Sequence, residues 1–187
     1  MDITLSRLLK LSFTIFILLS CIPAFSINSS EANMVIPSAG SAEVPFLFDY
    51  NGQQNIFERK ATCKANFDSQ YICIEVTVPL KSSYKPTGLN QNDGPIWNDD
   101  RIEVFLQPNA SGPFYQYIVN AQGAVYDAKD RNKEWNGNAS FKVDTNADNW
   151  KINIKIPFSD INFDPSKDSI IRGNVAVASN EPGNTFL

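Results

Sequence analysis

Several polar and aromatic side chains in the second half of the chain have types and spacings suited to holding a ligand. Trp97 lies between a Gly-Pro pair and Asn-Asp-Asp, a polar setting that favours an exposed indole. Such a ring offers a flat apolar face on which the C–H face of a ring-shaped ligand can stack. Glu103 follows closely, and a carboxylate forms strong charge-assisted hydrogen bonds with hydroxyl groups. The alternatives are a Trp97 that caps the edge of the fold and a Glu103 that pairs with Arg101 or a lysine.

Three further side chains are candidate contacts for the same ligand. Gln116 and Asn120 share a parity in the next predicted strand, so both should face the side that Glu103 faces. Their amide groups can both donate and accept hydrogen bonds. Trp135, in a polar segment further on, is a candidate second aromatic contact. The alternative for Asn120 is formation of the turn that follows it, and for Trp135 it is anchoring of its own loop.

The elements that must position these residues are short strands separated by turns. The run 101–107 alternates polar and apolar residues, which is typical of a strand with one buried face. With 115–120 and a short run ending at 127, it is predicted to form an antiparallel meander. Trp150 alternates with polar residues in step with three isoleucines, so it is assigned to the core. The other predicted strands are 45–50, 61–67, 71–79, 141–144 and 170–178, with one helical turn at 158–161.

This pattern predicts an all-β fold, an antiparallel β-sandwich of the immunoglobulin-like or jelly-roll-like kind. The chain has no histidine, which excludes Ser-His-Asp and Cys-His catalysis and histidine-ligated zinc or haem. Cys63 and Cys73 lie on opposite faces of consecutive predicted strands, so we expect two unpaired thiols. The formal net charge of −4 and the lack of a basic stripe argue against nucleic acid and anionic membranes as partners.

The N-terminal segment has the features of an export signal. Basic residues precede an apolar run at 11–22, and Ala24-Phe25-Ser26 is a small-x-small cleavage site. The run 18–21 also resembles a lipoprotein box, in which Cys21 would be lipidated. We therefore expect a secreted, periplasmic or cell-surface protein with no membrane span after signal removal. The predicted organisation is a signal peptide at 1–26, a leader or linker at 27–44 and one domain at 45–187.

The motifs also occur in a recognisable order. The chain contains, in sequence, IWNDDRIEVFLQP, YQYIVNAQGAVYD, WKINIKIPFSDI and IRGNVAVA, which resembles the family 9 carbohydrate-binding modules and their close relatives. The resemblance runs from about Ala61 to Ala178. It implies a β-sandwich domain that binds polysaccharide or oligosaccharide in a secreted glycan-degrading protein, with Trp97 as one of two tryptophans that sandwich the sugar. DOMON-type cytochrome domains have a similar outline, but their histidine ligand is absent here.

Two departures from the family pattern bear on these expectations. Ile118 stands where the sugar-binding members have an arginine. The family's closing segment, with its second tryptophan and last strand, is not found before Leu187. We therefore expect either a fragment or a domain that lacks its last C-terminal strand.

Three functions remain open on the sequence. The first is an exported, non-catalytic glycan-binding module that supports carbohydrate catabolism. The second is a glycoside hydrolase using Asp100 with Glu103, which would need two carboxyl groups about 5–10 Å apart across a cleft. The third is a structural or adhesive surface domain without sugar affinity, which Ile118 favours. A structural Ca²⁺ is possible for all three, held by Asp99, Asp100, Asp127 and Asp130, although turn formation explains these residues as well.

Overall fold

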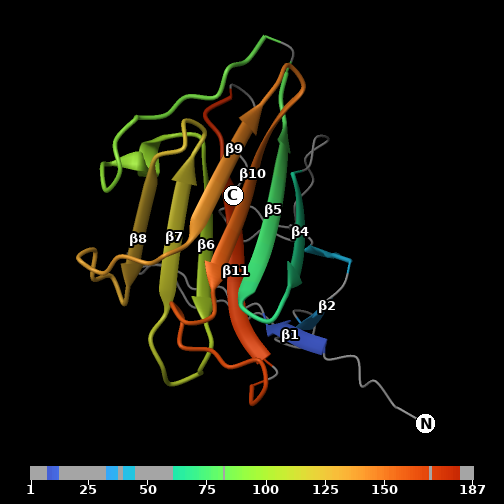
Figure 1. The fold of residues 1–187 in the computed structure, drawn as a ribbon. Coiled ribbons are helices and arrows are strands. Elements are labelled where there is room, and N and C mark those ends of the chain that lie inside the picture. The colour runs from blue at the N-terminus through green and yellow to red at the C-terminus, as the bar shows by residue number, and fades with distance from the viewer. Residues whose placement is uncertain are drawn as a thin grey trace, which may run out of the picture.

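The computed structural model describes residues 8–12, 33–37, 40–44, 61–81, 83–168 and 170–181. In these ranges the chain forms two stacked β-sheets, with only one short 3-10 helix, η2, at Ile96–Asn98 (Figure 1). The predicted antiparallel β-sandwich is therefore confirmed. No helix in the described ranges has the length and apolar character needed to cross a membrane.

The first sheet has six strands in the order β2-β1-β11-β6-β7-β8. Its neighbouring strands pair antiparallel, apart from β1 and β11, which are parallel. The bounds are β1 Leu8–Ser12, β2 Asn33–Pro37, β6 Arg101–Gln107, β7 Tyr115–Asn120, β8 Val125–Lys129 and β11 Ile170–Ala178.

The second sheet has five strands in the order β3-β4-β5-β10-β9, all antiparallel. In Figure 1 β10 crosses in front of β11, which places the two sheets face to face. The bounds are β3 Ala42–Val44, β4 Thr62–Phe67, β5 Tyr71–Pro79, β9 Ser140–Thr145 and β10 Asn149–Pro157.

The core lies between the inner faces of the two sheets. Along β6 and β10 the apolar members of each alternating run are buried, as the alternation predicts. Trp150 is fully buried, which confirms its assignment to the core. Cys63 points into the core and Cys73 away from it, and neither forms a disulfide. Burial, with a smaller contribution from Glu75, raises the pKa of the Cys63 thiol to about 12.

The structure differs from the sequence expectations in the N-terminal part. The predicted leader contains two strands, β2 and β3, and β3 extends the second sheet by pairing Ala42 with Ala65 of β4. These runs are short and weakly alternating, so the partner strand rather than the local pattern defines them. At 158–161 the chain forms turns rather than a helix.

Other predictions fall on parts of the chain that the structure does not describe. The expected strand at 45–50 and the segment beyond 181 lie outside the described residues, as does most of the predicted signal peptide. Within that peptide β1 is described, and it pairs Lys10 with Ile170 of β11. Export and cleavage therefore stay predictions.

Candidate functional site

The outer face of the six-stranded sheet, the face turned away from the core, carries most of the predicted ligand contacts. In the register of β6 and β7, Glu103 lies opposite Ile118 and Phe105 lies opposite Gln116. Directly opposed residues of an antiparallel pair share a face, and so do residues two apart on one strand. Phe105 is two residues from Glu103 and lies opposite Gln116, so Glu103 and Gln116 point to the same side. Arg101 lies opposite Asn120 and belongs to this face as well. The shared face that the sequence predicts for these side chains is therefore present.

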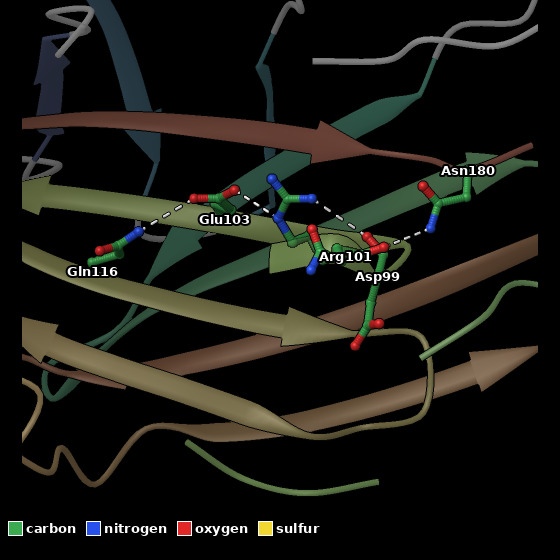
Figure 2. A network of polar contacts seen from close by, with 6 residues as sticks. Asp99, Arg101, Glu103, Gln116 and Asn180 are labelled. Carbon is green, nitrogen blue, oxygen red and sulfur yellow. Dashed lines mark hydrogen bonds and ion pairs between the residues drawn. The ribbon is translucent and has the colours of Figure 1, made fainter. Parts of the chain in front are cut away.

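Glu103 is held in place by hydrogen bonds to its neighbours (Figure 2). Its Oε1 accepts from Arg101 Nε at 2.8 Å and its Oε2 accepts from Gln116 Nε2 at 3.2 Å. Arg101 also donates from Nη1 to the Asp99 carbonyl at 3.4 Å. A carboxylate has about four lone-pair sites, so Glu103 keeps acceptor capacity for a further donor. The side chain is thus fixed in orientation but not saturated.

Trp97 carries an exposed aromatic ring on the same face of the sheet as this network. It belongs to η2, and 52% of its surface is exposed. The preceding residue, Ile96, is fully buried and packs with Ile118 and Ala124, with Tyr126 against them. Because Ile118 and Glu103 are directly opposed, this packing places η2 on the same outer face as Glu103. The exposure expected for the indole is observed.

Asn120 does not present its amide to solvent. Its side chain is fully buried, and its Nδ2 donates to the Leu89 carbonyl at 2.7 Å and to Asp99 Oδ2 at 2.8 Å. Its Oδ1 accepts from the backbone N–H groups of Gln122 and Ala124. Both donors and both lone pairs of the amide are therefore in use, and Asn120 joins the turn after β7 to the loop before η2. This is the turn-forming role that the sequence left open as the alternative.

The loop before η2 approaches Asn120 so closely that one position has no room for a side chain. A Cβ added to Gly88 would lie 2.7 Å from Asn120 Nδ2 and 2.9 Å from its Cγ. Neither atom can move away, because the amide is hydrogen-bonded on both sides. Gly88 therefore permits the contact that orders this loop.

Asp100, like Asn120, holds this region together through the hydrogen bonds of its side chain. It is fully buried, and its Oδ2 accepts from Tyr84 Oη at 2.7 Å and from the backbone N–H of Thr87 at 2.6 Å. Its Oδ1 accepts from Ser179 Oγ at 2.9 Å and from the backbone N–H of Asn180 at 2.8 Å. Burial, followed by the hydrogen bond to Asp100, raises the pKa of Tyr84. A carboxylate committed in this way cannot serve as the catalytic partner of Glu103 that the hydrolase hypothesis requires.

Trp135 lies on the other side of the sheet from Glu103. Its ring meets Tyr115 and Tyr117 edge to face, with ring centroids 5.4 and 5.9 Å away. Both tyrosines are buried on the inner face of β7, opposite in direction to Gln116. Trp135 is therefore an anchor for its own loop against the core edge, and it does not join the surface that carries Trp97 and Glu103.

The four aspartates named as possible calcium ligands are not gathered at one point. Asp99 and Asp100 serve the loop before η2, Asp127 accepts from the Gly137 N–H at 2.8 Å, and Asp130 accepts from the Phe114 N–H at 2.9 Å. No group of three or more acidic, cysteine or histidine side chains in the described part of the chain has a geometry suited to a metal ion. A bound Ca²⁺ stays a prediction.

The pairing of Glu103 with Arg101, which the sequence left open as the alternative, is observed. Sequence reasoning offered turn formation for Asp100 but did not identify its hydrogen bonds to the end of β11. Two adjacent aspartates directly before an alternating strand were a usable indication, because short acidic side chains at such a point often accept backbone N–H groups. Arg101 and Glu103 share the parity of one strand, which indicates that their side chains can meet.

A comparison with known protein families agrees with this geometry. Residues 37–185 match the sequence model described as the carbohydrate family 9 binding domain-like family. The chain belongs to this family. The match extends beyond the motif order seen in the sequence at both ends, since it includes the segment of β3 and residues 179–185. No curated protein matches the chain.

Two solved structures share the fold of this family 9 domain. One, from Bacteroides uniformis, is a protein whose carbohydrate binding is itself inferred. It is 12% identical with a TM-score of 0.53, over 70% of this chain and 68% of that one. The other is a family 9 module from Caldicellulosiruptor kristjanssonii in complex with cellotriose. It is 15% identical with a TM-score of 0.50, over 71% of this chain and 65% of that one, slightly less than two thirds of its length. At these identities the likeness concerns the fold.

Proposed function

We propose that this family 9 domain is a non-catalytic glycan-binding module whose site is the outer face of the six-stranded sheet. The observation that carries the proposal is the exposed indole of Trp97 on the same face as a pre-oriented Glu103. The indole stacks against the C–H face of a pyranose, and Glu103 accepts hydrogen bonds from its hydroxyl groups. Carbohydrate binding by the family and by a structural neighbour supports this assignment.

The fixed geometry of Glu103 favours binding of an uncharged, hydroxyl-rich ligand. Ordering a free glutamate on binding costs about 0.5–1.5 kcal/mol, and here Arg101 and Gln116 have already fixed the carboxylate. The Arg101 guanidinium balances its charge, so a neutral sugar meets a nearly neutral pair. The amide of Gln116 retains a second N–H and its carbonyl oxygen for the same ligand.

The proposed context is export and glycan degradation. The predicted signal peptide at 1–26 would deliver the domain to the cell surface or beyond it, where polysaccharide is met. There the domain would hold an associated degrading activity on its substrate. Ile118, where sugar-binding relatives have arginine, removes one donor from the site, so we expect Arg101 to supply the guanidinium on this face.

The proposal is tested by replacing the indole. Trp97→Ala should weaken binding at least about 30-fold, because loss of a central aromatic contact typically costs 2 kcal/mol or more. Retardation on native gels containing xylan or cellulose measures the effect. Tyr71→Ala is the matched control, since it removes a half-buried ring from the outer face of the other sheet. If neither the wild-type chain nor the variant is retarded by a broad panel of glycans, the domain is structural or adhesive instead.

A further inference from the structure

The turn that follows β8 has an unusual backbone conformation. Lys129 and Asn132 close a two-residue loop, because the Asn132 N–H donates to the Lys129 carbonyl at 2.8 Å and the Lys129 N–H donates to the Asn132 carbonyl at 3.3 Å. Both loop residues are left-handed, Asp130 with a φ of 50° and Arg131 with a φ of 67°. This is the type I′ pattern, which favours Asp followed by Gly. Arg131 therefore stands where glycine would fit without strain.

The two loop residues differ in what holds them. Asp130 helps to form the turn, since its Oδ1 accepts from the Phe114 N–H at 2.9 Å and its own N–H donates to the Phe114 carbonyl at 2.9 Å. Arg131 is exposed, and within the described part of the chain it forms no ion pair. The left-handed conformation destabilises a residue that carries a Cβ but not glycine. The stability of the fold therefore does not explain a guanidinium at the tip of this turn.

Two lysines flank the guanidinium. Lys133 is exposed, and the Lys129 ammonium lies 5.6 Å from the centroid of the Tyr115 ring, a cation–π contact. Neither lysine forms an ion pair with a carboxylate in the ranges that the structure describes. Residues 129–134 contain three basic and two acidic side chains, a net charge of +1, whereas the whole chain has −4. The turn is thus a basic tip on an acidic protein, which favours an anionic partner.

An aromatic ring lies beside these cations. The Asn132 carbonyl also accepts from the Trp135 N–H at 3.3 Å, and the Trp135 ring meets the same Tyr115 ring with centroids 5.4 Å apart. Trp135 is half-buried. A carboxylated sugar combines an anionic group with a C–H face, so it can meet a guanidinium through its carboxylate and an indole through its ring. An acidic peptide offers only the carboxylates.

The turn is remote from the proposed sugar site. β8 begins at Val125, whose carbonyl accepts from the Asp93 N–H in the loop before η2, and it ends at Lys129 (Figure 1). At about 3.4 Å per residue the strand spans roughly 14 Å. The two surfaces therefore lie at opposite ends of β8, and each can be removed without the other.

We propose that the turn at 129–133 is a second binding surface, which takes the carboxylate groups of a polyuronate, an acidic polysaccharide. Arg131 binds a carboxylate through its planar fork of N–H groups, Lys133 adds a second positive charge, and Trp135 lies against the sugar ring. The domain then has two surfaces of different chemistry, one for a neutral sugar and one for an acidic sugar. This inference goes beyond the proposed function and does not depend on it.

The test is electrophoresis of the full chain through native gels that contain polygalacturonate, with poly-L-glutamate gels in parallel. Polygalacturonate should retard the wild-type protein, and Arg131→Gly should weaken this binding about fivefold, because one charge-assisted contact is lost. The same variant should melt about 2 °C higher, since glycine is unstrained at this position. Lys64→Ala is the control, because it removes an exposed cation from the outer face of the other sheet.

A second variant separates the lost charge from the added flexibility of glycine. Asn tolerates the left-handed conformation, so Arg131→Asn should weaken polygalacturonate binding as much as Arg131→Gly does. Retardation of the wild-type protein should also disappear at about 0.5 M NaCl, because salt screens contacts between exposed charges.

The outcomes separate this inference from the proposed function. Absence of retardation by polygalacturonate at low ionic strength overturns the second surface. Equal weakening by Arg131→Gly and Lys64→Ala overturns it too, since only the net charge would then matter. Equal retardation by poly-L-glutamate would assign the turn to an acidic peptide instead, and a lower melting temperature in Arg131→Gly would contradict the strain. Trp97→Ala should leave polygalacturonate binding unchanged, so either proposal can fail while the other stands.

Discussion

Asp100 and Glu103 are carboxylates at the start of the same strand, yet the structure uses them in opposite ways. Asp100 is fully buried, and both of its oxygens accept hydrogen bonds from the loop before η2 and from the end of β11. Glu103 is 15% exposed and accepts one hydrogen bond on each oxygen. The Asp100 carboxylate therefore holds the loops together, whereas the Glu103 carboxylate keeps lone pairs for a ligand.

The difference follows from the direction of each side chain. Asp100 lies just before β6, where the chain turns and three segments converge, so its carboxylate meets several orphan N–H and O–H donors. Glu103 stands on the outward parity of β6, where only its strand neighbours can reach it. A carboxylate surrounded by backbone donors becomes structural, whereas one surrounded by side chains on an open face keeps lone pairs for a ligand.

The largest expected effect comes from removing the buried carboxylate. Asp100→Ala leaves two backbone N–H groups and the hydroxyls of Tyr84, Thr87 and Ser179 without their acceptor, so the free energy of unfolding should fall by about 3 kcal/mol or more. Urea denaturation measures it. Asp144→Ala is the matched control, because that carboxylate is 54% exposed in a surface ion pair and should change stability by less than about 0.5 kcal/mol. Equal losses in the two variants would contradict the structural role of Asp100.

Glu103→Gln should show the reverse pattern. The amide keeps an acceptor for Arg101, so stability should change by less than about 1 kcal/mol. Glycan affinity should fall about tenfold, since a hydrogen bond to a charged acceptor is worth roughly 1.5–3 kcal/mol. Titration with the tightest-binding oligosaccharide measures this. A variant that loses stability but retains its affinity would place Glu103 in the same class as Asp100.

Asp127 is a third carboxylate, intermediate in role between Asp100 and Glu103, and its substitution should have the smallest effect of the three. Burial raises its pKa above the ordinary value of 3.8, opposed by the Gly137 N–H, with Asp93 and Asp160 adding to the rise. The native carboxyl then holds its proton more tightly than the unfolded chain does. Stability from this group is therefore greatest below pH 3.8 and falls as the pH rises through the raised native pKa.

Asp127→Asn removes this titration and keeps an oxygen for the Gly137 N–H. At pH 7 the variant should be more stable than the wild type by less than about 1 kcal/mol, and the decline in stability above pH 3.8 should be smaller. Thermal unfolding followed from pH 3 to pH 7 compares the two proteins. An unchanged pH profile would show that Asp127 is not penalised by its burial.

The alternation of residues was enough to predict the sandwich and the outward direction of Glu103 and Gln116, because a strand allows only two directions for a side chain. It was not enough for Asn120. That side chain has the predicted parity, but the backbone of Leu89, far away in the sequence, covers it. The position of a long loop depends on such distant contacts, which no local pattern records.

Trp135 shows the same limit in another form. Residues in a loop have no parity, so nothing in the sequence assigns its ring to the inner or the outer side of the sheet. The ring packs against Tyr115 and Tyr117, where a buried aromatic surface is available. The strands from β4 onward could therefore be predicted from their alternation, whereas β1, β2, β3 and the loops that complete the site could not.

The two cysteines of the β4–β5 hairpin have a practical consequence. Cys63 is sealed in the core with its thiol strongly held in the protonated form, and Cys73 stands half-covered on the far sheet beside Lys155. Alkylating reagents should therefore modify Cys73 and spare Cys63 in the native state. A fluorophore attached there would report tumbling of the domain on insoluble polysaccharide without touching the surface that holds it.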